Sequence, residues 1–187
     1  MPPTIDRRST LIATALLPPE RTALIMIGAE RYLARRQPVA PMPHLAAAAA
    51  LLKDARRAGI HVLHVRRVQE GETPPEVRLR PAGADPRRGA ALAGERVVDV
   101  RGPSPFAETR LDEELALRGI DAVVIAGVMT PASCTATTNE ALARRYRTVV
   151  VADLLHEDVR ENKRRLGAEV LCISTIRGLL GVTAKAA

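Results

Sequence analysis

Aromatic residues are scarce in this sequence, which contains no tryptophan and in which phenylalanine and tyrosine make up 2% of 187 residues. The core is therefore expected to consist of alanine, valine, leucine and isoleucine side chains. Stacking on nucleobases requires aromatic platforms, and the many arginines are scattered among acidic residues. The net charge of +7 therefore does not indicate a nucleic-acid partner, although it is compatible with a small anionic ligand.

Cysteines and long apolar runs are also scarce. Cys134 and Cys172 do not make a disulfide framework, and no run approaches the ~20 apolar residues of a membrane span. The apolar run near the N-terminus is short for a signal peptide, and no clear cleavage site follows it. We expect a cytoplasmic chain without a membrane partner, forming a single domain over residues 1–187 with an N-terminal extension at 1–18.

What the sequence does contain is a regular alternation of apolar strand patterns and helix patterns. Strands are predicted at 22–27, 60–65, 96–100, 120–126, 148–152 and 170–173, and helices at 44–58, 106–118, 131–145, 157–166 and 175–180. Residues 66–94 are rich in proline, glycine and charge and are expected to form a long loop with at most a short helix. The pattern predicts an α/β fold: a doubly wound, mainly parallel six-stranded sheet with helices on both faces, a Rossmann-like three-layer sandwich.

In such a fold, ligands bind beyond the carboxyl ends of the strands. The turns at 28–30, 100–106 and 127–133 should therefore surround one crevice. In the third turn, Thr130 can cap the following helix and Pro131 can take its first position. The first strand is not followed by a glycine-rich dinucleotide motif, and no metal-ligand spacing is visible, so we expect neither a cofactor nor a metal.

Several segments taken together resemble the isochorismatase-like family, also called the cysteine hydrolase superfamily. The likeness covers residues 19–180 and includes an opening strand, a Phe-x-x-Thr-x-Leu segment from Phe106 to Leu111, and a Gly-Val-x-Thr turn at 127–130. Thr137, Ala141 and the stretch from Tyr146 to Asp153 extend the match. One departure lies in the second segment, where Glu108 replaces the family's glycine.

The resemblance implies a catalytic Asp, Lys and Cys, and this sequence replaces all three. The family's Asp ends the first strand and serves as acid and base, and its position falls on Gly28. The Lys ends the third strand, and its position falls on Val100. The Cys attacks a carbonyl three residues after the turn threonine, where this chain has Ser133. Cys134 lies one step further along the helix, rotated by about 100°.

The turn can still be expected to bind a ligand. By resemblance it would contain a cis peptide between Val128 and Met129, and substrate would lie against Val128, Met129, Thr130 and Phe106. The amides of Met129 and Ser133 would then form an oxyanion-type donor pair. The alternative for Thr130 and Ser133 is simple helix capping.

Other polar groups near the crevice are candidates for a changed chemistry. Glu30 and Arg101 could act beside Ser133 as catalytic residues. A serine nucleophile needs a neighbouring base, and a Ser133–His64–Glu30 arrangement is conceivable. The alternative for His64, a histidine near a strand end, is a hydrogen-bonded structural role.

These observations leave three functional hypotheses. The first is an enzyme that acts on a small molecule by chemistry that does not depend on a cysteine, with specialised metabolism as a candidate setting. The second is a catalytically inactive pseudo-hydrolase that serves as a binding or partner subunit. The third is a conventional amide or enol-ether hydrolase that uses Cys134. By resemblance, the chain is expected to form a homodimer or homotetramer.

Overall fold

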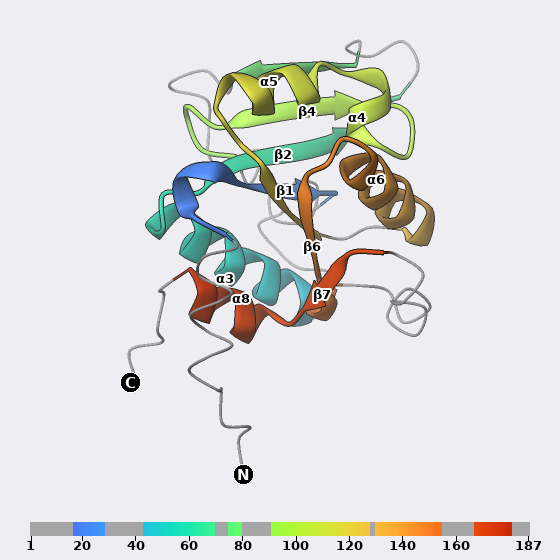
Figure 1. Ribbon diagram of the computed structural model, residues 1–187. Helices are drawn as coiled ribbons and strands as arrows, with labels where there is room; N and C mark the ends of the chain where they lie inside the picture. The colour runs from blue at the N-terminus through green and yellow to red at the C-terminus, as the bar shows by residue number, and fades with distance from the viewer. Residues whose placement is uncertain are drawn as a thin grey trace.

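A seven-stranded sheet forms the centre of the protein, as shown by a computed structural model that describes residues 17–28, 43–69, 75–79, 91–127, 130–154 and 167–180 (Figure 1). The strands are β1 (Thr22–Ile27), β2 (His61–Arg67), β3 (Glu76–Leu79), β4 (Arg96–Val100), β5 (Ala122–Gly127), β6 (Arg147–Val151) and β7 (Glu169–Leu171). Their order is β3-β4-β2-β1-β5-β6-β7. All neighbours are parallel except β3 and β4. The predicted α/β fold with a mainly parallel sheet is confirmed.

Helices cover both faces of the sheet. They are α3 (Pro43–Arg57), α4 (Pro105–Glu108), α5 (Leu111–Leu117), α6 (Pro131–Ala143) and α8 (Ile173–Leu179), with short 3-10 turns η1 (Pro19–Arg21) and η3 (Ala152–Leu154). Figure 1 shows α3 and α8 packed side by side. No helix among the described residues is long and apolar enough to cross a membrane.

Two cores result from the alternation of side chains along each strand. In β1, Ile25 and Ile27 belong to the core that packs against α4, α5 and α6. Leu24 and Met26 point the other way and belong to the core under α3 and α8. The strands are therefore buried on both faces, which explains their near-continuous apolar sequences.

The structure corrects the prediction in the 66–94 segment and raises the strand count from six to seven. Residues 76–79 form β3, an antiparallel edge strand beside β4. Its alternation of charged and apolar residues is short, and its pairing depends on Asp99 of β4, which binds Arg78 of β3 and Arg66 of β2. β2 also continues to Arg67, two residues beyond the predicted end.

The helix predicted at 106–118 is two helices, α4 and α5. Thr109 separates them in an extended conformation. Its hydroxyl donates a hydrogen bond to the carbonyl of Pro105 at 2.6 Å and accepts one from the amide of Leu111 at 3.2 Å. One side chain therefore ends the first helix and starts the second. The helix predicted at 157–166 and the first sixteen residues of the N-terminal extension lie outside the described residues.

Candidate active site

A pocket of about 330 Å³ lies at the carboxyl ends of β1, β2 and β4, beside the start of α6. It is lined by Ile27, Gly28, Val65, Arg67, Val100, Gly102, Pro103, Thr130 and Ser133. These residues include Gly28, Val100 and Ser133, the three positions that the sequence assigns to the family's Asp, Lys and Cys. The structure thus brings together three positions that are far apart in the chain.

Two glycines shape the approach of the chain to this pocket. Gly28 ends β1 with a positive φ of 68°, and its amide still bonds to the carbonyl of Val65 at 3.0 Å. Gly127 ends β5 with φ 128° against the backbone of Ile27, with which a Cβ atom would overlap. Only glycine fits this close approach of β5 to β1, which places the next turn beside the pocket.

Thr130 and Ser133 form the cap of α6. The Thr130 hydroxyl oxygen accepts a hydrogen bond from the Ser133 amide at 3.2 Å and donates its proton to Ser133 Oγ at 3.1 Å. The Ser133 amide therefore takes part in the cap of α6, as the capping alternative predicts, and the oxyanion-type donor pair of Met129 and Ser133 stays a prediction. Val128, Met129 and the expected cis peptide between them lie outside the described residues.

Arg67 is the pocket residue that the sequence analysis missed. It is the last residue of β2 and pairs in register with Val100 of β4. Its guanidinium donates to the carbonyl of Arg101 at 2.7 Å and to Ser133 Oγ at 3.4 Å. Strand alternation could have identified Arg67, because a residue two positions after Val65 points to the same face of the sheet. The predicted strand ended at Val65, so this alternation was not extended to Arg67.

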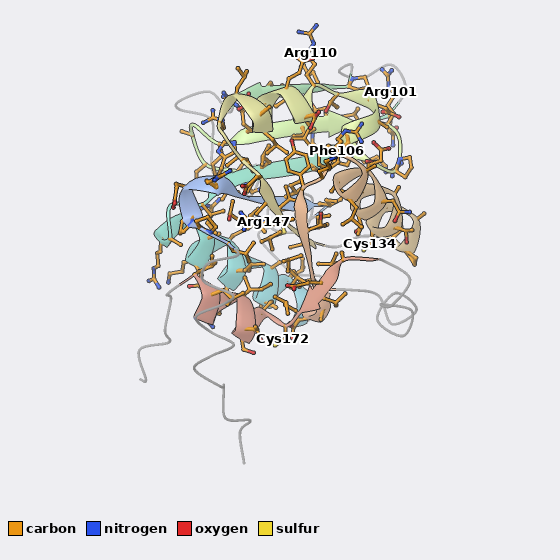
Figure 2. All side chains as sticks on the ribbon, in the orientation of Figure 1. Arg101, Phe106, Arg110, Cys134, Arg147 and Cys172 are labelled. Atoms are coloured by element: carbon orange, nitrogen blue, oxygen red, sulfur yellow. The ribbon has the colours of Figure 1, made fainter. Side chains whose placement is uncertain are left out.

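Arg101 contributes its backbone to the site and does not line the pocket. Its exposed side chain lies at the periphery in Figure 2. Its amide donates to the Glu108 carboxylate at 2.9 Å. Hydrogen bonds from the Gly102 and Arg101 amides lower the pKa of Glu108. The acidic residue that replaces the family's glycine thus holds the loop between β4 and α4 in place.

His64 does not reach Ser133. It is fully buried on the face of the sheet opposite Val65, and its Nε2 atom lies 2.8 Å from Glu95 Oε2. Burial by itself would raise the pKa of Glu95, but hydrogen bonds from His64 and Arg56 outweigh it and lower that pKa to about 2. The Ser133–His64–Glu30 arrangement is therefore wrong, and the structural role of His64 is confirmed. Glu30 lies outside the described residues.

Cys134 and Phe106 both belong to the core between the sheet and the helices α4 to α6. Cys134 is 1% exposed, and burial raises the pKa of its thiol. The ring of Phe106 packs against that of Tyr146 with centroids 5.9 Å apart, and the guanidinium of Arg144 lies 5.2 Å from the Phe106 centroid. Neither residue lines the pocket. Within the described ranges, no group of three His, Cys, Asp or Glu residues could hold a metal ion.

Comparison with known proteins agrees with this geometry. Residues 22–165 match the isochorismatase domain family. Because this match covers most of the chain, the protein belongs to the isochorismatase family. A comparison with curated protein sequences finds no match.

Solved structures show the same fold. An isochorismatase family protein from Desulfovibrio vulgaris is 25% identical, with a TM-score of 0.65 over 86% of this chain and 98% of that one. A cysteine hydrolase from Pseudomonas syringae pv. phaseolicola is 18% identical, with a TM-score of 0.63 over 89% and 95%. An N-carbamoylsarcosine amidase from Thermoplasma acidophilum is 23% identical, with a TM-score of 0.61 over 82% and 96%. This chain therefore spans nearly the whole length of these relatives.

Proposed function

We propose that the protein acts on a small molecule in the pocket between β1, β4 and α6, without a covalent cysteine intermediate. The observation that supports this proposal most is the lining of the pocket. Gly28, Val100 and Ser133, to which the resemblance assigns the family's three reactive positions, line the pocket, while Cys134 is buried in the core. A family scaffold with a formed pocket is thus retained, and the thiol is absent from its lining.

A conventional hydrolase reaction through Cys134 would need the start of α6 to rotate. The thiol would have to leave the core, and Ser133 would have to give up its hydrogen bonds to Thr130 and Arg67. Burial also raises the pKa of Cys134, which disfavours the thiolate that acts as the nucleophile. These contacts favour a reaction in which the protein binds and orients its substrate.

A second candidate function is that of a binding subunit without catalysis. It is favoured by the pocket lining, in which Arg67 is the one ionisable side chain among the described residues. A guanidinium does not exchange protons near neutral pH, so it can hold a ligand but cannot serve as an acid or base.

Mass spectrometry of a metabolite extract incubated with the purified protein tests both functions. An enzyme consumes a metabolite in excess over the protein, whereas a binding subunit retains at most one molecule per chain. Val100→Phe places a ring in the pocket and should abolish either effect, provided that circular dichroism shows a folded protein. If no metabolite is consumed or retained by the wild-type protein, both functions are contradicted.

A further inference from the structure

Among the described arginines of β2, β3 and β4, Arg67 is the one that forms no ion pair with an acidic residue. Arg66 is adjacent in sequence but points to the opposite face, where it binds Asp99 through two hydrogen bonds of 2.7 and 3.0 Å. Arg78 and Arg96 likewise pair with Asp99 and Glu114. Among the described residues, Arg67 contacts the neutral oxygens of Arg101 and Ser133. Its charge is therefore not balanced by an ion pair within them.

The charge near the pocket has one further contributor, Glu108. This carboxylate attracts Arg67 electrostatically, but it lies outside the pocket lining. Its oxygens accept hydrogen bonds from the backbone of the β4–α4 loop, and it is exposed to solvent. Among the described residues, the groups that line the pocket thus carry one positive charge and no negative one.

Two donors point to the same part of the pocket wall. Arg67 carries five N–H groups in a planar fork that matches a carboxylate, and its two described bonds leave others available. Ser133 is 6% exposed, and its Oγ already accepts from Thr130. Its own hydroxyl proton is therefore available to donate to a ligand.

We propose that the pocket recognises a small carboxylic acid, whose carboxylate binds between the Arg67 guanidinium and the Ser133 hydroxyl. The inference depends on the proposed function, because it names the class of ligand for the same pocket. A volume of about 330 Å³ is at the small end for ligand pockets. The ligand is therefore a compact acid, comparable in size to a substituted benzene ring.

The register of the sheet explains how this chain has a cation here without a lysine. Arg67 pairs with Val100, to which the resemblance assigns the family's lysine position. The positive charge thus comes from the neighbouring strand. A guanidinium stays charged at all physiological pH values and does not transfer a proton. Its role is to bind and orient the acid, and binding should not change with pH between 6 and 9.

Titration calorimetry with benzoate and benzamide tests this inference, because the two probes share a shape and differ in charge. We expect benzoate to bind the wild-type protein at least tenfold more tightly than benzamide. Arg67→Ala should remove this preference, and Arg67→Gln should do the same with less loss of packing. Arg110→Ala removes an exposed arginine that does not line the pocket and should leave the preference unchanged.

Several outcomes would overturn the inference. Equal affinity for the two probes, absence of benzoate binding, or a benzoate preference that survives Arg67→Gln would each do so. Inorganic phosphate that binds more tightly than benzoate would show that the pocket selects a different anion. If a metabolite is consumed equally by wild-type protein and Arg67→Ala, the proposed function stands and the carboxylate inference falls. If benzoate is preferred but no metabolite is consumed or retained, the carboxylate inference stands and the proposed function falls.

Discussion

Adjacent residues at the start of α6 have opposite surroundings. Ser133 lines the pocket and contacts Arg67, whereas Cys134 is packed in the core. One helical step rotates a side chain by about 100°, so the chemical character of the site depends on this register. With serine at the pocket position, the Cys134 thiol lies in the core and does not line the pocket.

At this scale, the reactivity of the two cysteines is predictable. Cys134 is buried and its pKa is raised by burial, whereas Cys172 is exposed and hydrogen bonds from Ser174 and Thr175 lower its pKa. Iodoacetamide at pH 8 should therefore label Cys172 in the native protein and spare Cys134, as measured by peptide mass spectrometry. Equal labelling rates would show that the Cys134 thiol reaches solvent. Both cysteines should react in denaturant, which serves as the control.

At the scale of elements, the end of β5 determines where the pocket turn begins. Gly127 lies against the backbone of Ile27 in a conformation that other residues rarely adopt. This contact brings β5 close to β1. Strand order runs outward in opposite directions from these two strands, and α/β folds bind ligands at such a switch point. The location of the pocket therefore follows from the topology and from this glycine.

Gly127→Ala should destabilise the protein by about 3 kcal/mol, because strain in φ adds to a backbone overlap. Gly119→Ala is the matched control. Gly119 also has a positive φ of 67°, but a Cβ there would meet no atom within 4 Å, so its cost should be about 1 kcal/mol. Urea denaturation measures both. Similar costs for the two variants would contradict the close approach at Gly127.

The edge strand β3 depends on a charged cluster. Asp99 is fully buried and lies between Arg66 of β2 and Arg78 of β3. Asp99→Asn removes its negative charge and should cost about 3 kcal/mol, near the lower end for breaking a buried ion pair, since both arginines are partly solvated. Glu113→Gln breaks an exposed pair with Arg110 and should change stability by less than about 1 kcal/mol. Thermal denaturation distinguishes the two; a cost for Asp99→Asn as small as that of the control would count against the cluster.

At the scale of the whole molecule, acid stability is set partly by His61. Burial and, to a smaller extent, the charge of Arg118 lower the pKa of His61, Glu114 opposes them, and the resulting pKa is about 4. Between pH 6.5 and 4, the unfolded chain binds a proton at His61 and the folded chain does not. The free energy of unfolding therefore falls as the pH falls through this window.

His61→Gln should flatten the dependence of stability on pH between 6.5 and 4, by up to about 3 kcal/mol over the window. Glu95 acts at lower pH, because its pKa of about 2 means that its stabilising contribution is lost between pH 4.5 and 2. Glu95→Gln should therefore change the slope there, with a smaller effect in the upper window, because Glu95 contributes only weakly to the pKa of His61. Urea denaturation at a series of pH values measures both slopes. An unchanged slope for His61→Gln between pH 6.5 and 4 would contradict the depressed pKa.

The expected assembly into a homodimer or homotetramer stays a prediction. Light scattering coupled to gel filtration measures the mass of the assembly directly. A monomer at concentrations near 0.1 mM would contradict it.

The sequence predicted best where apolar periodicity is strong, as in β1 and β4. It predicted less well where polar side chains decide the structure. Thr109 interrupts a helix through two hydrogen bonds, and β3 pairs with β4 beside Asp99; neither contact has a signal in local hydrophobicity. Gly28, Val100 and Ser133 were placed correctly in one crevice, because the ends of parallel strands meet at one edge. Arg67 was missed because the predicted strand ended at Val65, two residues before the end of β2.

The central claim is that this member of the isochorismatase family works through its pocket without a thiol. The most direct test is the consumption or retention of a metabolite by the double variant Cys134→Ala/Cys172→Ala, which removes both cysteines of the chain. We predict the same effect as for the wild-type protein, once circular dichroism shows that the variant is folded. Loss of the effect in Cys134→Ala, with retention in Cys172→Ala, would contradict the account.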